Sequence, residues 1–234
     1  MTKLGIAINL ERCVGCNTCA NACKMQNNIP MNMLYIRVET DGVDTADGAQ
    51  GTYPDLSRTY IPVACQHCEN PACLKVCPVG ATYKDDMGRV EIHYDKCIGC
   101  RICMAACPYN ARVFNWSEPE RDPNWNYGDK DVPVRPKGVA EKCTLCNHLT
   151  AAGEKPACVK NCCGKARFYG DLDDPNSDVS KELAAAAPDA IHYLPDAGNG
   201  PLSAYILSPK FGEWRADDLT QTTNLYVTTE GSVD

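Results

Sequence analysis

The feature that most constrains this chain is a run of four cysteines that ends in a proline. Gaps of two, two and three residues separate the cysteines in the segment Cys97-Ile-Gly-Cys-Arg-Ile-Cys-Met-Ala-Ala-Cys107-Pro108. Three thiolates spaced this closely can hold three corners of one [4Fe–4S] cluster, and the fourth, one helical turn further on, reaches a second cluster. Pro108 turns the chain away, because proline lacks the N–H that a continuing helix needs. Such a run therefore requires a partner run elsewhere in the chain.

Three further blocks of cysteines resemble this run. The second gap widens to four residues in block two and to eleven in block four, and Lys24 and Cys163 stand where the other two blocks have proline. Sixteen of the seventeen cysteines fall into the blocks, which indicates an internal repeat of a metal-binding unit. Blocks one to four are, in order, Cys13, Cys16, Cys19 and Cys23; Cys65, Cys68, Cys73 and Cys77; Cys97, Cys100, Cys103 and Cys107; and Cys143, Cys146, Cys158 and Cys162.

A cysteine content this high has three interpretations: disulfides, zinc sites or iron–sulfur clusters. Disulfide bonding gives no reason for four quartets with recurring gaps. Zinc sites favour well-separated Cys-x-x-Cys pairs. Block four alone could be a zinc ribbon, but blocks one and three, with three cysteines in seven residues, could not. We therefore favour four [4Fe–4S] clusters, and keep a zinc-binding structural module as the alternative from a different class.

The composition suits a chain that is organised around metal sites. Aromatic residues make up 7% of the 234 residues, so metal–thiolate bonds have to replace part of a large apolar core. The net charge of −7 and the lack of a basic stripe argue against nucleic acid as a partner. We find neither an N-terminal export signal nor an apolar run near the roughly 20 residues of a membrane span. We expect a soluble chain that reaches a membrane only through another subunit.

Short strands are expected between the blocks, with a hairpin that turns at Asp85–Gly88. A helix is expected over 179–187, behind an N-cap in 171–177. Residues 41–54 are predicted to be an exposed loop, and 116–139 an ordered loop in which Trp116, Trp125 and Tyr127 serve packing or an interface. No pattern is assigned to the last twenty residues. The predicted strands are 4–9, 34–39, 81–84, 89–94, 191–194 and 203–207.

Three residues beside the cysteines invite a role. His67 lies between two block-two cysteines, which already fill the ligand positions, so we predict a hydrogen-bonding or packing residue. The charge of Lys142 could tune a cluster potential or could be solvated, and the sequence does not decide between the two. Cys163 is predicted to be a small buried thiol, with an alternative ligand or a redox thiol as the other interpretations. No triad, phosphate loop or paired carboxylates stand out, which predicts a non-catalytic chain.

Together these motifs resemble the iron–sulfur (beta) subunits of the molybdenum bis-pterin oxidoreductases, the dimethyl sulfoxide reductase family. The resemblance spans residues 3–208 and is carried by Cys65-Gln-His-Cys-Glu-Asn-Pro-Ala-Cys73, the segment from Cys97 to Arg112, Lys142-Cys-Thr-Leu-Cys146 and Gly170-Asp-Leu-Asp-Asp-Pro175. It implies an electron-transfer subunit, not an enzyme, that carries four [4Fe–4S] clusters in anaerobic respiration. Its partners would be a molybdenum or tungsten bis-pterin catalytic subunit and a quinol-oxidising or other donor subunit. A ferredoxin-like subunit of a hydrogenase or formate–hydrogen lyase complex is the alternative.

The resemblance also implies how the blocks pair. Blocks one and four form one two-cluster ferredoxin fold, and blocks two and three form another, with the fourth cysteine of each block crossing to the partner's cluster. The implied ligand sets are Cys13, Cys16, Cys19 and Cys162 (set A); Cys143, Cys146, Cys158 and Cys23 (set B); Cys65, Cys68, Cys73 and Cys107 (set C); and Cys97, Cys100, Cys103 and Cys77 (set D).

The expected fold is therefore of the α+β class, with two interlocked bacterial-type ferredoxin folds. Residues 1–35 with 140–175 would form one domain and 60–115 the other. Residues 36–59 and 116–139 would be connecting insertions, and 176–234 a C-terminal extension. Relatives are often exported folded with the catalytic subunit, so the resemblance implies the outer face of a membrane, with the cytoplasm as the alternative.

Overall fold

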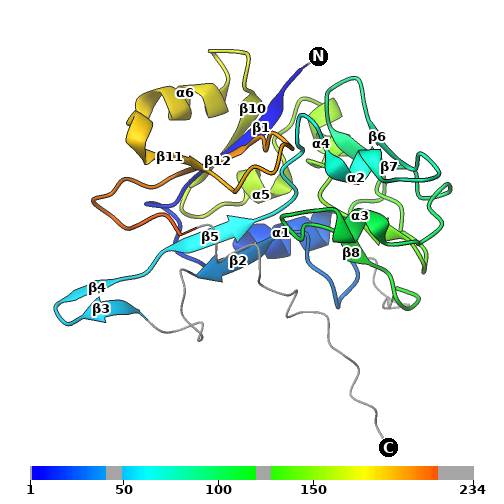
Figure 1. Ribbon diagram of the computed structural model, residues 1–234, viewed down its shortest axis with the longest axis horizontal. Helices are drawn as coiled ribbons and strands as arrows, with labels where there is room; N and C mark the ends of the chain where they lie inside the picture. Colours follow the sequence, from blue (N-terminus) through cyan, green and yellow to red (C-terminus); the bar gives the residue numbers. More distant parts are fainter. Residues whose placement is uncertain (1, 41–48, 120–127, 216–234) are drawn as a thin grey trace, which may run out of the picture.

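The computed structural model describes residues 2–40, 49–119 and 128–215, in which short strands alternate with short helices (Figure 1). In chain order the elements are β1 Leu4–Asn9, α1 Thr18–Gln26, β2 Arg37–Thr40, β3 Gln50–Thr52, β4 Asp55–Ser57, β5 Tyr60–Val63, α2 Ala72–Lys75, β6 Thr82–Lys84, β7 Val90–Ile92, α3 Ile102–Ala105, β8 Val113–Phe114, β9 Ala140–Glu141, α4 Asn147–Ala151, α5 Ala157–Lys160, β10 Arg167–Asp171, α6 Asp178–Ala185, the 3₁₀ turn η1 Pro188–Ala190, β11 Ile191–Tyr193 and β12 Ser203–Ile206.

The largest sheet joins the strand before block one to the strands after block four. Its order is β10-β1-β12-β11, with β1 antiparallel to β10 and parallel to β12. Every residue of β1 is buried, because it is an inner strand and α6 packs on β1 and β10. The C-terminal segment is therefore part of this sheet, since β12 lies directly beside β1.

Blocks two and three lie on either side of a hairpin. β6 and β7 pair antiparallel, and α2 and α3, which carry the third cysteine of each block, pack together. The hairpin turns where the sequence predicts, because the Asp85 N–H donates to the Arg89 carbonyl at 3.0 Å and the Asp85 carbonyl accepts from the Gly88 N–H at 2.9 Å. This unit begins with β5 and ends with β8.

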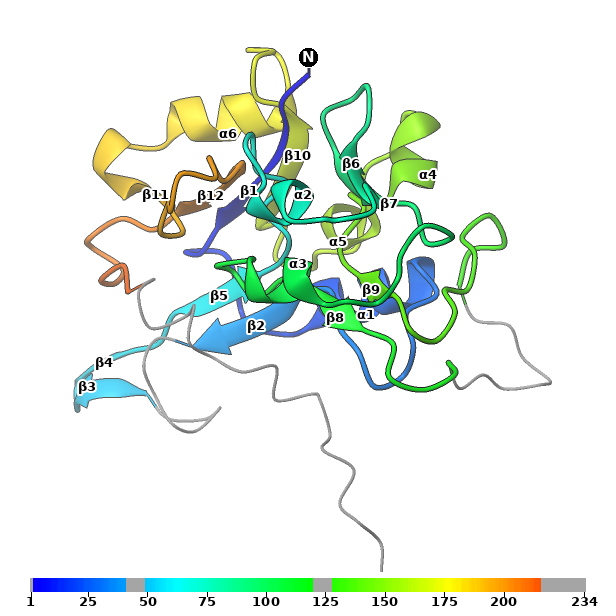
Figure 2. The same ribbon diagram turned by 45° about the vertical axis from the view of Figure 1, so that its right-hand side comes forward.

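Two small ladders connect this unit to the rest of the chain. β5 pairs with β2, and β8 pairs with β9, so the chain from β5 to β8 is inserted between β2 and β9 (Figure 2). A buried cluster of polar groups ties the same junction together. The Glu141 carboxylate receives hydrogen bonds from Arg135 Nε at 2.7 Å, and from Tyr35 and Asn115. Glu141 is fully buried, and a buried carboxylate without such partners would destabilise the fold.

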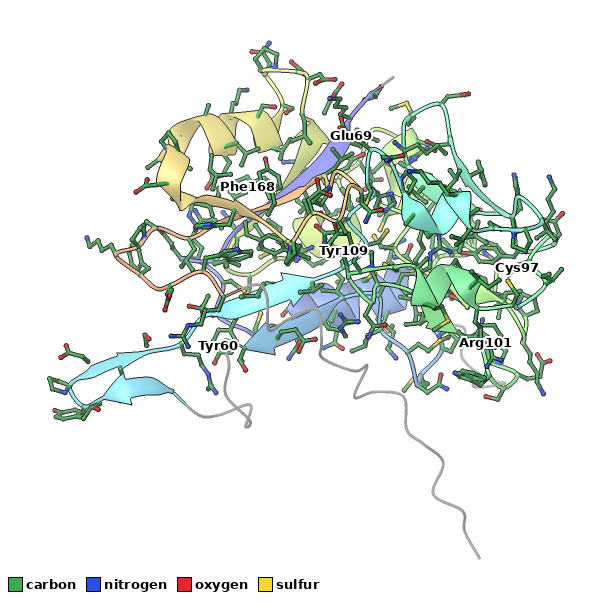
Figure 3. The ribbon with its side chains drawn as sticks, viewed as in Figure 1. Tyr60, Glu69, Cys97, Arg101, Tyr109 and Phe168 are labelled. Carbon is green, nitrogen blue, oxygen red and sulfur yellow. The ribbon has the colours of Figure 1, made fainter. Side chains whose placement is uncertain are left out.

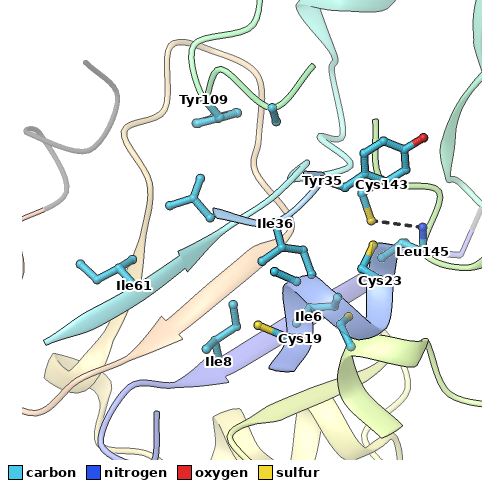
Figure 4. Packing of buried hydrophobic residues seen from close by; sticks show 14 of the residues in the cluster. Ile6, Ile8, Cys19, Cys23, Tyr35, Ile36, Ile61, Tyr109, Cys143 and Leu145 are labelled. Atoms are coloured by element: carbon cyan, nitrogen blue, oxygen red, sulfur yellow. Dashed lines mark hydrogen bonds between the residues drawn. The ribbon is translucent and has the colours of Figure 1, made fainter. Parts of the chain in front are cut away.

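The core contains cysteines as well as aliphatic side chains. Figure 4 shows Ile6, Ile8 and Ile36 packed beside Cys19 and Cys23. Five predicted ligands belong to this buried cluster, which fits a chain whose centre contains sulfur as well as hydrocarbon. They are Cys19, Cys23, Cys68, Cys143 and Cys158. None of the helices in the described part of the chain is long and apolar enough to cross a membrane.

The predicted strands at 4–9, 191–194 and 203–207 and the predicted hairpin are confirmed within one or two residues. The strand expected from residue 34 begins only at Arg37. The loop predicted for 41–54 is wrong in its second half, where β3 and β4 pair around a turn that contains Pro54, a residue that presets its own backbone angle. Residues 41–48 lie outside the described part of the chain.

Helix α6 has the expected N-cap, since Ser177 Oγ accepts a hydrogen bond from the Ser180 N–H at 3.1 Å. It ends at Ala185, two residues before the predicted end, because Pro188 disfavours helical backbone at the residue before it. In the connector, Trp116 packs edge-on against Phe114 with ring centres 4.8 Å apart. The predictions for Trp125 and Tyr127 lie outside the described residues.

Candidate iron–sulfur centres

The loops of blocks one and three have the same backbone shape. Gly15 and Gly99 have positive φ angles of 66° and 68°, and the residues two further on, Asn17 and Arg101, have φ angles of 57° and 61°. A Cβ on Gly15 would lie 2.4 Å from the Tyr60 ring, and one on Gly99 would lie 2.4 Å from a backbone oxygen. Glycine is therefore required at both positions, for its backbone angles and for the close approach.

A small cavity lies against block one. It is lined by Cys13, Cys16 and Cys19, by Cys162 from block four, and by Arg167. These four cysteines are set A, so the structure brings together in one cavity four thiols that come from distant parts of the chain. β10, which follows Cys162 and pairs with β1, holds the two blocks in place.

A second small cavity lies against block three. It is lined by Cys97, Cys100 and Cys103, by Cys77 from block two, and by Arg112. These four cysteines are set D. Figure 3 shows Cys97 and Arg101 at one edge of the molecule, far from Phe168, which follows the arginine of the first cavity. The two cavities therefore lie towards different ends of the chain's body.

The cysteines of set B also gather, in the interior. Burial, and then the neighbouring thiols of Cys143, Cys146 and Cys158, raise the pKa of the Cys23 thiol. All four side chains are buried. Cys23 therefore lies beside three cysteines of block four.

Set C gathers in a corresponding way. Burial, and then the thiols of Cys65, Cys107 and Cys73, raise the pKa of Cys68 to about 12. A metal binds cysteine as the thiolate, which such surroundings disfavour unless positive charge is close. Iron binding and the packing of these buried thiols are therefore coupled.

Hydrogen-bond donors point at several of these sulfurs. The Ala81 N–H donates to Cys77 Sγ at 3.2 Å, and the Ala166 N–H donates to Cys162 Sγ at 3.3 Å. Both donors lie four residues after the cysteine, so the two units share this local geometry. Asn27 Nδ2 donates to Cys146 Sγ at 3.4 Å, and Figure 4 marks the bond from the Leu145 N–H to Cys143 Sγ. Donors of this kind stabilise thiolate sulfur in iron–sulfur sites.

Each unit buries one arginine among its cysteines. Arg112 and Arg167 are 2% and 5% exposed, and each stands five residues after the last cysteine of its block. In both arginines, Nε and Nη1 make no well-formed hydrogen bond to the described part of the chain. Arg112 lies against the thiols of Cys73 and Cys103. A buried cation without a partner is costly, so these positions fit a negatively charged group, which a [4Fe–4S] cluster with four thiolates is.

Three predictions about neighbouring residues can now be compared with the structure. His67 is buried and its Nδ1 accepts a hydrogen bond from the Val90 N–H at 3.1 Å, which confirms a hydrogen-bonding role. The solvated alternative for Lys142 is wrong, because the side chain is 1% exposed and Nζ donates to the Cys143 carbonyl at 2.6 Å. The prediction of a buried Cys163 thiol is also wrong, because the turn after Cys162 lies at the surface and Cys163 is exposed.

Arg112 and Arg167 were not predicted from the sequence. The signal that could have found them is their shared offset of five residues from Cys107 and Cys162, at the point where a strand begins. The cluster of polar groups around Glu141 was not predicted either, because no local pattern exists for it.

Comparisons with known proteins identify the family of the chain. Two family models, each described as a 4Fe-4S dicluster domain, match the chain, one over residues 56–121 and 131–172 and the other over residues 12–81. The chain is 53% identical to a Halobacterium salinarum protein named as a dimethyl sulfoxide reductase iron–sulfur subunit, in a match that covers 88% of this chain and 79% of that protein.

Two further relatives carry related names. The iron–sulfur subunit of the arsenate respiratory reductase of Shewanella sp. (strain ANA-3) is 39% identical, with 88% of this chain and 97% of that protein covered. The iron–sulfur cluster-binding subunit of the menaquinone reductase of Nitratidesulfovibrio vulgaris is 36% identical, with 91% and 90% covered. The resemblance seen in the cysteine motifs is confirmed, and so are multiple [4Fe–4S] clusters as the cofactors. The chain belongs to the family of ferredoxin-type iron–sulfur subunits of reductase complexes, whose members transfer electrons and are not the catalytic subunits.

Proposed function

We propose that the four cysteine sets A to D each hold one [4Fe–4S] cluster and that the clusters form a single line for electrons. The observation that carries this proposal is an unbroken series of neighbouring thiols from one set to the next. Burial raises the pKa of Cys19, Arg167 lowers it, and the thiol of Cys158 raises it again. Cys19 belongs to set A and Cys158 to set B, so these two sets are neighbours.

The link between the two units is the one that cysteine spacing does not supply. Burial, and then the thiol of Cys65, raise the pKa of Cys143, so a sulfur of set B lies beside a sulfur of set C. Burial raises the pKa of Cys103, Arg112 lowers it, and the thiol of Cys73 raises it again. Cys73 belongs to set C and Cys103 to set D, so these two sets are also neighbours. These three pairs of electrostatic neighbours support the order A, B, C, D.

The exposure of the sulfurs supports the same order. Cys16 of set A and Cys100 of set D are exposed, whereas all of set B and Cys68 of set C are buried. Electrons that enter or leave through partner subunits need a cluster near the surface. Solvent exposure affects the reduction potential of a cluster, so the clusters in the middle of the line can be buried. Sets A and D are therefore the two ports.

The strand pairing supports two interlocked ferredoxin-like folds. β1 and β10 enclose blocks one and four (residues 1–35 with 140–175), and the β6–β7 hairpin lies between blocks two and three (residues 60–115). Segments 36–59 and 116–139 connect the two folds, and 176–234 form the C-terminal extension, whose β12 joins the sheet of the first fold.

The partners are inferred from the names of the relatives and from the family resemblance. At set A we place a molybdenum or tungsten bis-pterin catalytic subunit, and at set D a quinol-oxidising or other donor subunit. The relatives named as subunits of an arsenate respiratory reductase and of a menaquinone reductase support a respiratory complex of this kind. We infer the outer face of a membrane as the location, with export together with the catalytic partner.

The chain purified without oxygen tests the cluster assignment. We expect about sixteen irons and about sixteen acid-labile sulfides per chain, and broad absorption near roughly 400 nm. A zinc module would contain zinc and lack this absorption. A stable preparation with about eight irons would overturn the assignment of two of the four sets.

A further inference from the structure

A fifth sulfur stands at the rim of the first cavity. Cys163 Sγ lies 3.3 Å from Cys16 Sγ, and both side chains are exposed. Cys16 lines the cavity, while Cys163 follows Cys162, another of its lining residues. Blocks two and three have Pro78 and Pro108 at the position of Cys163, and block one has Lys24, so block four alone among the blocks has a thiol there.

The distance between the two sulfurs has a direct consequence for an iron atom held by Cys16. A cysteine side chain has one rotatable bond to its sulfur, with three staggered positions. A sulfur that already touches a ligating sulfur therefore needs only a small rotation to approach the same corner of a cluster. Nothing in the short turn between Cys162 and Cys163 has to unfold for that motion.

A second observation indicates that this cavity binds an anion. Arg167 lines the cavity, is 5% exposed, and has no well-formed hydrogen bond at Nε or Nη1 within the described part of the chain. A buried guanidinium needs a negative partner, because an uncompensated buried charge is strongly destabilising. The rim thiol thus stands at a site for which the buried arginine independently indicates a bound anionic group.

We propose that Cys163 is a reserve ligand for the cluster of set A, an inference that rests on the function proposed above. When the bond between iron and Cys16 Sγ breaks, Cys163 Sγ forms a bond to the same iron. The proton that leaves the Cys163 thiol passes to the Cys16 thiolate, so the number of thiolate ligands and the total charge stay unchanged. No electron moves, and the step needs no oxidant or reductant. One of the exposed corners of the line thereby has two thiols.

Alanine variants of the full chain test this inference, because alanine removes the ligand and, unlike serine, offers no oxygen in its place. We expect Cys16→Ala and Cys163→Ala each to keep the iron content of the unaltered chain, about sixteen per chain. The double variant should lose between about one and four irons, according to whether a three-iron cluster stays behind. Electron paramagnetic resonance of the oxidised sample distinguishes these two results, since a three-iron cluster is paramagnetic when oxidised.

Cys100→Ala is the matched control, because Cys100 is the exposed cysteine of set D and Pro78 offers no thiol beside it. We expect this variant to lose iron as the double variant does. If Cys16→Ala loses as much iron as Cys100→Ala, Cys163 is not a reserve ligand, while the ligand sets stand. If Cys100→Ala keeps all its iron, the ligand sets themselves are wrong.

Alkylation gives a readout that does not depend on the stability of the double variant. In the unaltered chain Cys163 is a free, exposed thiol and should react with iodoacetamide under anaerobic conditions. In Cys16→Ala it should become protected, at least about tenfold in rate, because its sulfur then binds iron. Unchanged reactivity of Cys163 in Cys16→Ala would overturn the inference even if the iron content were preserved.

Discussion

Replacing Arg167 with glutamine removes a buried positive charge from between two of the proposed clusters. The side chain is 5% exposed, and its neighbours include Cys19 of set A and Cys158 of set B. Reduction adds one electron to a cluster, and a nearby positive charge favours that electron. The variant should therefore have lower reduction potentials at both clusters.

The size of the change follows from the burial of the guanidinium. With an effective dielectric constant of about 20 and a separation of about 8 Å from an electron spread over the cube, the interaction is about 2 kcal/mol. For a one-electron couple this corresponds to a fall of about 90 mV. The clusters of sets C and D should shift by less than half as much, because the interaction weakens with distance.

Redox titration monitored by electron paramagnetic resonance measures these potentials, once the iron content shows that all clusters are present. Arg167→Lys is the control that keeps the charge, and it should shift the potentials much less. Arg112→Gln is the matched variant in the other unit, where the shift should fall on sets C and D instead. An equal shift of all clusters, or a shift below about 20 mV in Arg167→Gln, would contradict this account of the two arginines.

Three further predictions concern stability. Glu141→Gln should lower the free energy of unfolding by about 3–5 kcal/mol, because it leaves the buried Arg135 guanidinium without its carboxylate; urea unfolding measures this, and a loss below about 1 kcal/mol would contradict it. Burial raises the pKa of Glu91 from 4.5 to about 7, so its contribution is fully present below pH 4.5 and is lost as the pH rises through 7. Glu91→Gln should flatten that part of the stability profile, and an unchanged profile would show that another group titrates. Removal of the clusters by a chelator and an oxidant should abolish cooperative thermal unfolding, whereas an apo-chain that melts cooperatively with native circular dichroism would refute the coupling of iron binding to folding.

Much of the chemistry of this protein is local and can be read from the sequence. Cys97, Cys100 and Cys103 lie within seven residues, so three of the four proposed ligands of one site are close together before any tertiary contact forms. The same holds for the hairpin around Asp85 and Gly88, whose turn needs only neighbouring residues. The pairing of blocks came from the family resemblance, since spacing alone does not say which distant cysteine completes a set.

The tertiary structure decided how the sites are arranged and which charges surround them. The thiol of Cys65 is an electrostatic neighbour of Cys143, and this pair joins the two halves of the proposed line. The β2–β5 and β8–β9 ladders link the same two halves of the chain. Backbone pairing between segments far apart in sequence leaves no local pattern, because any two extended segments can form such hydrogen bonds. The burial of Arg112 and the exposure of Cys163 have the same origin: both depend on which distant segments cover a side chain, and local sequence does not record that.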